Sequence, residues 1–395
     1  MSSVARSREY ADADARRSRR SRWTPRLRRR AAVVILFERR QSLPLSRTAH
    51  VADGPMDATM LFLPTDAQPP HALANWRDTL QHPDWLAEHG DAWRKALAHD
   101  VVKYEAIDPD LAPRWTCIII AYRSKEFLLE ALDIGRACTS PDGGPVEWLV
   151  VDCGGLEPLL PEIRKRADSI LTLTPDIGLN PARNAALAYA RGAFVAILDD
   201  DGLIAPDWLV RAERHFDDPS VVALRGRIRF KAHRYFTTLA SHYDRGEGVV
   251  DDTLAVEGNM AIRRGAYYAS NGFGTRFYGG EGAWMTWRLL KALAGCRVIY
   301  APDVIMRHDF YQNWQHFLRK ARSYSNILDQ LAVQESAAQE FQQFLHADWN
   351  KSYPKRQMRP DERVAWAALH AAKWCVQWQA KAAVSGDRTT ASPRR

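Results

Sequence analysis

The sequence predicts an α/β fold built on a mainly parallel β-sheet. Between residues 114 and 310, short apolar segments alternate with amphipathic ones, and this alternation is typical of βαβ units. The first strand segment is apolar throughout, as expected where helices cover both faces of a sheet. The composition, 46% hydrophobic and 26% charged, is that of an ordinary globular protein and excludes collagen-like, wholly disordered and membrane-embedded classes.

Strands and helices alternate in the first half of this region. Strands are expected at residues 115–121, 148–152, 170–173 and 193–198, with helices between them at residues 126–138 and 161–167. A third helix opens at Asn180 and Pro181. Asn180 suits the N-cap, and Pro181 suits the first helical position.

The second half predicts fewer regular elements. They are a helix at 207–216, an extended segment at 221–230, a helix at 284–293 and a returning strand at 297–300 that leads into a turn at 300–303. Composition divides the whole chain into five parts. These are a basic disordered tail at 1–55, an N-terminal extension at 56–113, the α/β domain at 114–310, a helical C-terminal extension at 311–384 and a disordered tail at 385–395.

The positive charge of the chain is concentrated at its N-terminus. Residues 1–40 contain 13 Arg and four acidic residues, a net charge of +9, which leaves −1 for the rest of a chain whose total is +8. A polybasic segment such as 16–30 can contact phospholipid or polyanions without specifying a reaction. We expect a disordered tail, with weak attraction to a membrane surface as the alternative, and no specific nucleic-acid partner.

The apolar run at residues 31–37 does not predict a membrane span. It is seven residues long, whereas about 20 are needed to cross a bilayer. Glu38, Arg39 and Arg40 follow it, in place of the small residues of a signal-peptide cleavage site. A cytoplasmic location is therefore expected, with peripheral contact at the inner face of the membrane as the alternative.

Carboxylates follow two of the expected strands. Asp152 ends the second strand, and Asp199, Asp200 and Asp201 follow the fourth. In an open parallel α/β sheet, ligands bind beyond the carboxyl ends of the strands. Three adjacent carboxylates repel one another, and their oxygens suit a hard divalent cation such as Mg²⁺ or Mn²⁺. The alternative is that these acids cap the next helix or lie solvated in a turn.

The order of these segments resembles that of family 2 glycosyltransferases, which have the GT-A fold. The most similar segment is GLNPARNAALAYARGAFVAILDDDGLIAPDWL, which carries the family's Gly, Ala-Arg-Asn and Asp-x-Asp positions. The family's Val-Val-Asp-Asp-Gly-Ser is matched by WLVVDCGG, and its first strand and helix by CIIIAYRSKEFLLEAL. The resemblance covers residues 114–310 and implies a Rossmann-like nucleotide-diphospho-sugar transferase domain with helical extensions on both sides.

The resemblance also implies a donor site and a metal site. Asp152 would contact the nucleobase or ribose, and Arg183 the diphosphate, with a surface salt bridge as the alternative for Arg183. His308 follows the returning strand and would complete the metal shell, with a structural role as its alternative. The implied donor-binding residues are Tyr122, Asp152, Arg183, Asp199 and Asp200, and the implied ligands of Mn²⁺ or Mg²⁺ are Asp199, Asp201 and His308.

The acceptor half departs from the family at one position. The usual Glu-Asp-x-x-Leu-x-x-Arg begins here with Glu281 and Gly282 and ends with Arg288, so the aspartate most often credited as catalytic base is a glycine. An inverting transfer needs a carboxylate to take the proton of the acceptor hydroxyl, and Glu281 is the nearest substitute. The alternatives are that Glu281 binds the acceptor or has a structural role, or that the enzyme is inactive or differently organised.

Aromatic side chains and glycines around this motif suggest two further features. The aromatic residues can form platforms for sugar rings, although core packing is their more frequent use; they are Tyr278, Trp208, Trp284 and Trp287. The glycines predict a loop mobile enough to close over the site; they are Gly279, Gly280 and Gly282.

We therefore expect metal-dependent transfer of a sugar from a nucleotide-sugar donor to a hydroxyl of a glycan, lipid-linked or protein acceptor, with inversion. The alternative is a catalytically inactive protein of the same fold that binds nucleotides or polyanions. A nucleotidyltransferase is disfavoured, because no glycine-rich phosphate-binding loop with a basic residue follows the first expected strand.

Overall fold

The computed structural model describes residues 72–122, 127–274, 280–323, 337–349 and 358–390. The expected basic tail at 1–55 and the apolar run at 31–37 lie outside these residues. Within the ranges described, the chain has no helix that combines the length and the apolar character needed to cross a membrane.

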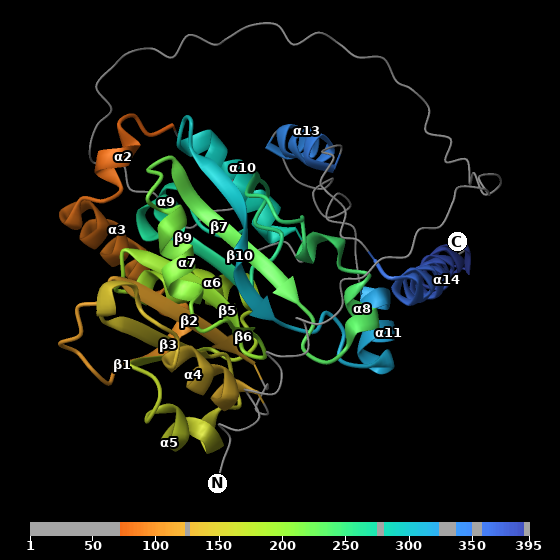
Figure 1. Cartoon of the computed structure of the whole chain (residues 1–395), viewed down its shortest axis with the longest axis horizontal. Coiled ribbons are helices and arrows are strands. Elements are labelled where there is room, and N and C mark those ends of the chain that lie inside the picture. The colour runs from red at the N-terminus through yellow and green to blue at the C-terminus, as the bar shows by residue number, and fades with distance from the viewer. Residues whose placement is uncertain (1–71, 123–126, 275–279, 324–336, 350–357, 391–395) are drawn as a thin grey trace, which may run out of the picture. The chain divides into compact units, whose positions relative to one another are not determined.

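A mixed β-sheet forms the centre of the fold, with its strands in the order β1-β4-β3-β2-β5-β9-β7-β10-β6 and β8 beside β10 (Figure 1). The strands are β1 (Val101–Ala106), β2 (Trp115–Ala121), β3 (Val146–Asp152), β4 (Ser169–Leu173), β5 (Phe194–Asp199), β6 (Leu203–Ile204), β7 (Val221–Arg229), β8 (Val250–Asp251), β9 (Asn259–Arg263) and β10 (Arg297–Arg307). The helices are α2 (Trp76–Thr79), α3 (Pro83–Ala96), α4 (Leu128–Arg136), α5 (Leu160–Ile163), α6 (Leu179–Tyr189), α7 (Trp208–His215), α8 (Arg234–Thr237), α9 (Arg264–Ala269), α10 (Glu281–Ala292), α11 (Trp314–Ser323), α13 (Ala337–Trp349) and α14 (Pro360–Thr390).

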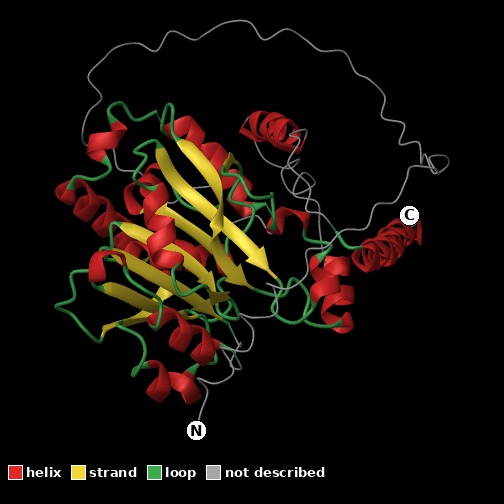
Figure 2. Ribbon diagram, in the orientation of Figure 1, coloured by secondary structure: helices red, strands yellow, loops and turns green. Residues whose placement is uncertain are grey.

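Helices cover both faces of the sheet (Figure 2). Successive strand side chains point to opposite faces, so Ile118 belongs to one hydrophobic core with α3, α6, α9 and α10. Its neighbours Cys117 and Ile119 belong to the other core, with α4 and α7. The apolar character of β2 on both faces therefore follows from burial on both sides, as the sequence predicted.

The strands β4, β3, β2 and β5 form the parallel block expected from the sequence. Each pairs in parallel with the next, and the chain enters them in the order β2, β3, β4, β5. Along the chain, β3 and β4 are therefore added on one side of β2, and β5 is then added on the other side of β2. Such a reversal in strand order leaves a crevice between the carboxyl ends of the two strands that flank it.

The antiparallel strand β9 was not predicted. It pairs with β5 on one side and β7 on the other, antiparallel to both. Its sequence, NMAIR, is short and ends in polar residues, so it lacks the long apolar run that marked the parallel strands. Because β10 is parallel to β7, the strands β5, β7 and β10 all point toward the edge of the sheet at which β9 begins.

The returning strand is longer than expected. The sequence predicted a strand at 297–300 and a turn at 300–303, whereas β10 continues to Arg307. The turn prediction was wrong because residues 302–304 form an irregularity within the strand, where the pairing register with β7 shifts between Ala301 and Ile305. Pro302 cannot donate a ladder hydrogen bond, and prolines within sheets are confined to such irregular positions.

The segment before residue 114 contributes to the same sheet. β1 pairs antiparallel with β4 at its edge, and α3 lies against both α6 and α9. The ring centroid of Trp93 in α3 lies 5.3 Å from that of Tyr267 and 5.1 Å from that of Tyr268, both in α9. Trp93 is fully buried. The first hydrophobic core therefore includes residues that the sequence assigned to an extension.

Helix α6 begins before the expected N-cap. Its N-cap is Gly178, with φ of 95°, a left-handed backbone angle that glycine adopts at little cost. Asn180 lies inside the first turn, where its Nδ2 donates a hydrogen bond to the Gly274 carbonyl at 2.8 Å. The N-cap prediction was therefore wrong, because the Asn180 side chain is used to hold a distant loop.

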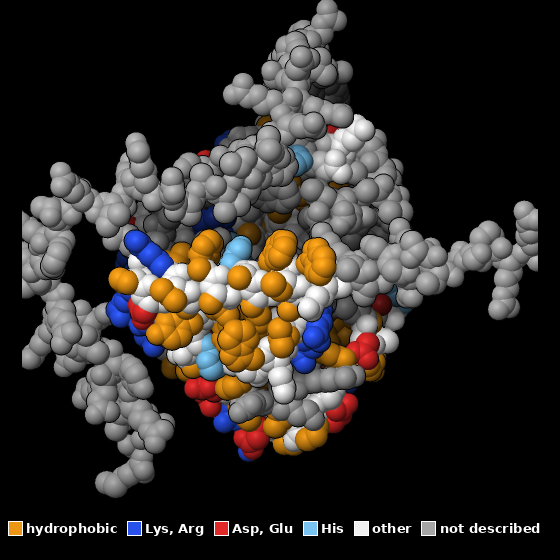
Figure 3. Space-filling view, turned by 90° about the vertical axis from the view of Figure 1, so that its right-hand side faces the viewer, with side chains coloured by type: hydrophobic (Ala, Val, Ile, Leu, Met, Phe, Trp, Pro, Cys, Tyr) orange, Lys and Arg blue, Asp and Glu red, His pale blue; other side chains and the backbone are white. Residues whose placement is uncertain are grey.

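The C-terminal region is helical, as expected. Its described residues form α11, α13 and α14, and α14 continues past Ser385 to Thr390. One side of α14 is apolar and exposed, with Val364 at 71%, Trp374 at 66% and Trp378 at 61% exposure. Figure 3 shows hydrophobic side chains gathered on this face of the molecule.

Candidate active site

The carboxyl ends of the parallel strands bring the predicted donor residues to one edge of the sheet. Ala121 at the end of β2 pairs with Asp152 at the end of β3, and Ile120 pairs with Asp199 at the end of β5. Tyr122 follows β2 directly and is 43% exposed. This edge is also the position that the strand order predicts for a ligand crevice.

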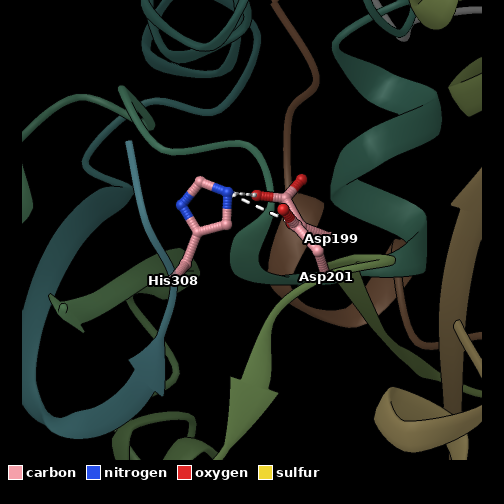
Figure 4. Close-up of side chains that lie close together, drawn as sticks. All are labelled: Asp199, Asp201 and His308. Atoms are coloured by element: carbon pink, nitrogen blue, oxygen red, sulfur yellow. Dashed lines mark ion pairs between the residues drawn. The ribbon is translucent and has the colours of Figure 1, made fainter. Parts of the chain in front are cut away.

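Asp199, Asp201 and His308 form a cluster at this edge (Figure 4). His308 Nε2 lies 3.2 Å from Asp201 Oδ1 and 3.7 Å from Asp199 Oδ2. One ligand atom from each residue lies within 4.8 Å of the others. The three residues come from the end of β5, the turn after it and the residue that follows β10.

The electrostatics of the cluster favour charged groups despite burial. Burial opposes ionisation of Asp201, yet the hydrogen bond with His308 holds the Asp201 pKa below its ordinary value. Burial likewise opposes protonation of His308, yet Asp201 and Asp199 raise its pKa. A positive charge is thus favoured between two carboxylates. Two carboxylates and an imidazole form an oxygen and nitrogen donor set of the kind that binds divalent metals.

Neighbouring groups orient the cluster. The Tyr243 hydroxyl lies 2.8 Å from His308 Nδ1, and Gln312 Nε2 donates to Asp201 Oδ2 at 3.0 Å. Burial raises the pKa of Tyr243 well above its ordinary value, so this phenol stays neutral. The nitrogen of His308 that faces the carboxylates is therefore Nε2, with Nδ1 engaged on the other side.

Gly258 leaves the space that the Asp199 carboxylate occupies. The Asp199 N–H donates to the Gly258 carbonyl at 2.9 Å, and a Cβ at position 258 would overlap the carboxylate of Asp199. A larger residue would therefore displace one member of the cluster. The turn before β9 is thus part of the wall of the site.

Asp152 and Asp200 both lie near Cys153, which follows β3. Asp152 is buried, and its Oδ1 accepts a hydrogen bond from the Gly154 N–H at 2.8 Å. Burial raises the pKa of the Cys153 thiol to about 12, with contributions from Asp152 and Asp200. Asp200 therefore acts on the β3 side, whereas Asp199 and Asp201 face His308.

Arg183 is buried in α6, at 4% exposure. Its Nη1 donates to Asn180 Oδ1 at 3.0 Å, and its guanidinium lies 4.9 Å from the centre of the Phe273 ring. The alternative of a surface salt bridge is therefore wrong. The positive charge of Arg183 reaches Glu257, whose pKa it lowers.

Glu281 is the first residue of α10 and is 6% exposed. Beside it lies Glu257, a carboxylate that the sequence analysis did not single out. Glu257 Oε1 accepts a hydrogen bond from the Gly282 N–H at 2.7 Å. Burial and the neighbouring Glu281 raise the pKa of Glu257 to about 7. No motif in the sequence marks Glu257, which lies just before β9, a strand that was itself not predicted.

Two lysines also reach the cluster and were missed. Lys320 lies in α11, and although burial lowers its pKa, Asp199 and Asp201 act in the opposite direction. Lys231 Nζ donates to the Asp201 carbonyl at 3.4 Å. Lys320 was assigned to a C-terminal extension, and nothing in its local sequence indicated that α11 returns to the strand ends.

The tryptophans considered as sugar platforms belong to the hydrophobic cores. Trp208 is fully buried, Trp284 is 3% exposed and Trp287 is 4% exposed, so core packing explains them. Gly282 is a buried residue of α10, and its assignment to a mobile loop was wrong. Tyr278 and Gly279 lie outside the described residues.

Residues 116–291 match the family model described as Glycosyl transferase family 2. These residues, the family 2 segment, are similar to that family. The family 2 segment runs from β2 into α10 and so contains Asp152, Asp199, Asp201, Glu257 and Glu281. The α/β fold of GT-A type that the sequence predicted is confirmed, as a mixed sheet whose parallel block is β4-β3-β2-β5.

Part of the chain is similar to parts of two curated proteins. It is 30% identical over 164 residues to the pre-mycofactocin glycosyltransferase of Mycobacterium tuberculosis, which covers 38% of this chain and 34% of that protein. It is 32% identical over 133 residues to the succinoglycan biosynthesis protein ExoO of Rhizobium meliloti, which covers 30% of this chain and 36% of that protein. The chain thus matches about a third of the length of these relatives.

Comparison with solved structures gives partial similarity to two proteins. The mannosyltransferase PcManGT from Pyrobaculum calidifontis, in complex with GDP-Man and Mn²⁺, is 22% identical with a TM-score of 0.45, over 80% of this chain and 88% of that one. S. aureus TarS 1–349 in complex with UDP-GlcNAc is 17% identical with a TM-score of 0.44, over 67% of this chain and 81% of that one.

Proposed function

We propose that this protein is a family 2 glycosyltransferase that transfers a sugar from a nucleotide-sugar donor to a hydroxyl of an acceptor, with a divalent cation. The observation that carries the proposal is the cluster of Asp199, Asp201 and His308 at the ends of β5 and β10. The cluster stands at the crevice where α/β sheets bind nucleotides. The donor base and sugar class are left to the experiment below.

Asp199, Asp201 and His308 are the residues that would hold Mn²⁺ or Mg²⁺. His308 Nε2 already faces both carboxylates, and with Nε2 as a ligand, Nδ1–H would donate to the Tyr243 hydroxyl 2.8 Å away. Such an outer partner fixes the orientation of a ligating imidazole. When bound, the cation supplies charge that stabilises a departing nucleoside diphosphate.

The remaining predicted donor residues fit a nucleotide that lies across the strand ends. Asp152 and Asp200, on the β3 side, would contact the ribose or base, next to the exposed Tyr122. Lys320 and Lys231 add positive charge near Asp201 for the diphosphate. Arg183 would act on the site through its charge, since its guanidinium is buried against Phe273.

Transfer with inversion is a single displacement. The acceptor oxygen attacks the anomeric carbon as the bond to the diphosphate breaks, and a carboxylate must take the hydroxyl proton. Glu281, the base expected from the sequence, is the first residue of α10, and Glu257 accepts a hydrogen bond from the N–H of the next residue, Gly282. We propose a hydroxyl of a glycan, a lipid-linked glycan or a protein as the acceptor, and a cytoplasmic location for the reaction.

Calorimetric titration with UDP-, GDP-, dTDP- and CMP-sugars tests the proposal. Binding of one donor with Mn²⁺ present, and its loss with EDTA, is the expected result and would name the donor. The same samples would then be assayed for release of nucleoside diphosphate. Binding without any release would favour a catalytically inactive nucleotide-binding protein, and no binding to any donor would contradict the proposed function.

A further inference from the structure

We propose that Glu257 is the group that accepts the proton of the attacking hydroxyl, and that Glu281 is a positioning residue beside it. This inference rests on the proposed transferase function. It assigns the base to the turn before β9, outside the motif in which the sequence placed it.

The topology delivers Glu257 to the edge of the sheet that holds the metal cluster. β9 is antiparallel to β5, so its first residues lie where β5 ends. Glu257 immediately precedes Gly258, on which the carboxylate of Asp199 packs. Glu257 and the Asp199 cluster therefore lie at the same edge of the sheet, as transfer requires of a base and a donor.

The second argument is steric and concerns position 282. A Cβ on Gly282 would overlap the carbonyl oxygen of Leu254 and would lie 2.8 Å from Glu257 Oε1. No side chain fits there without movement of the backbone. The Glu257 carboxylate instead occupies this space and accepts the Gly282 N–H at 2.7 Å. Residue 282 carries no carboxylate, and Glu257, from the turn before β9, places its own carboxylate beside it.

Glu257 is also the more accessible of the two acids. It is partly exposed, whereas Glu281 is 6% exposed. The Glu257 residue keeps some contact with solvent, while Glu281 is enclosed at the first turn of α10. A base must lie within hydrogen-bond reach of the proton that it removes, and burial at the Glu281 position works against such contact.

The charges that face Glu257 suit a base near neutral pH. Burial and Glu281 raise its pKa to about 7, while Arg183 and the Gly282 N–H act in the opposite direction. Lys320 of α11 also interacts with it. General bases work best when their pKa lies near the pH of operation. Glu281 therefore contributes by keeping Glu257 basic.

The step balances as follows. The acceptor oxygen forms its bond to the anomeric carbon while its proton passes to a Glu257 carboxylate oxygen. The electron pair of the breaking carbon–oxygen bond leaves with the nucleoside diphosphate. Glu257 then returns the proton to solvent, and water can replace the acceptor in the same step, giving hydrolysis of the donor.

Glu257→Gln tests the inference because the amide oxygen can still accept the Gly282 N–H while the basicity is lost. The assay is release of nucleoside diphosphate from the donor that binds the wild-type protein, with water or a sugar acceptor, between pH 5 and 9. We expect about a hundredfold lower turnover at least, with donor affinity by calorimetry within threefold of wild type. Glu130→Gln on the exposed face of α4 is the matched control.

Glu281→Gln separates the two carboxylates. Wild-type turnover should rise with pH through about 7, where Glu257 loses its proton. Without the negative charge of Glu281 the Glu257 pKa falls, so this rise should move to lower pH while transfer persists at pH 8. In Glu257→Gln the rise should disappear.

Two results would overturn the assignment. Turnover of Glu257→Gln above a tenth of wild type would exclude Glu257 as the base, and loss of turnover in Glu281→Gln alone would give the role to Glu281. Either result leaves the proposed function standing. A wild-type protein that binds donors but releases no nucleoside diphosphate would instead overturn the proposed function and the role of Glu257 with it.

Discussion

His308 Nε2 lies 3.2 Å from Asp201 Oδ1, although β7, β9 and α10 separate the two residues in the sequence. They meet because β5 and β10 run in the same direction, so that each strand delivers the residues after it to the same edge. When His308 is protonated, the contact is a charge-assisted hydrogen bond, a stronger class than a neutral one. A divalent cation bound here would replace the proton that His308 shares with the two aspartates.

Asp201→Asn should remove metal-dependent donor binding. The amide keeps the shape of the side chain but loses the negative charge that a hard cation prefers. We expect the affinity for Mn²⁺, and for the donor in its presence, to fall at least about tenfold. Calorimetry with and without EDTA measures both. Asp217→Asn, at an exposed position after α7, is the control, and equal affinities in the two variants would refute the metal assignment.

Tyr243→Phe should weaken metal binding without harming the fold. The hydroxyl lies 2.8 Å from His308 Nδ1, while the ring is buried beside Phe310. Loss of such an outer partner of a ligand typically costs about 10–100-fold in metal affinity. Titration with Mn²⁺ followed by electron paramagnetic resonance gives the affinity. An unchanged value, with an unchanged unfolding temperature, would mean that Tyr243 does not orient the ligand.

Gly282→Ala should destabilise the protein. The added Cβ would overlap the Leu254 carbonyl, and overpacking of this kind typically costs about 1–3 kcal/mol. Urea unfolding measures the change. Gly248→Ala is the control, because among the described residues a Cβ at position 248 meets nothing within 4 Å. If Gly282→Ala were as stable as the control, the Leu254 carbonyl would not pack closely against Gly282 of α10.

Glu257→Gln should stabilise the protein at alkaline pH and leave it unchanged at acidic pH. The Glu257 pKa is raised from 4.5 to about 7 in the folded state, so the folded protein holds a proton that the unfolded chain has already released. The free energy of unfolding contributed by this group therefore falls as pH rises from 4.5 to 7. Calorimetric unfolding at pH 5 and pH 8 compares the two proteins. A difference at pH 5 equal to that at pH 8 would contradict the raised pKa.

Removal of residues 1–55 should leave donor binding and turnover unchanged. The residues that form the sheet, the cluster and both cores all lie after residue 71. The truncated and complete chains would be compared by calorimetry and by nucleoside diphosphate release. A dead truncation with an intact unfolding transition would show that the basic segment takes part in the reaction.

The parallel half of the fold could be predicted from the sequence because its strands carry their signal locally. β2 is apolar along its whole length and β5 ends in a run of aspartates, so strand, direction and ligand edge follow from a few residues. β9 carries no such signal. Its five residues form a strand because β5 and β7 present unpaired edges on either side, which is a tertiary cause.

The candidate site divides in the same way. Asp199 and Asp201 could be placed from the strand before them, whereas their partners Lys320 and Tyr243 come from segments whose return to the edge is set by packing. Glu257 was missed for the reason that β9 was missed. Glu281 was found from its spacing to Arg288. This spacing does not indicate that Leu254 and Glu257 pack against the start of α10.

The antiparallel entry of β9 also affects how the site can diversify. Because β9 starts at the site and ends at the far edge, residues 230–258 form an excursion between two fixed strands, β7 and β9. Insertions or exchanges at residues 244–256 of this excursion would reshape the surroundings of Glu257 while sparing Gly258 and the β5 register, and so the position of Asp199. Relatives could therefore change their acceptor through one contiguous stretch of gene while inheriting the donor half unaltered.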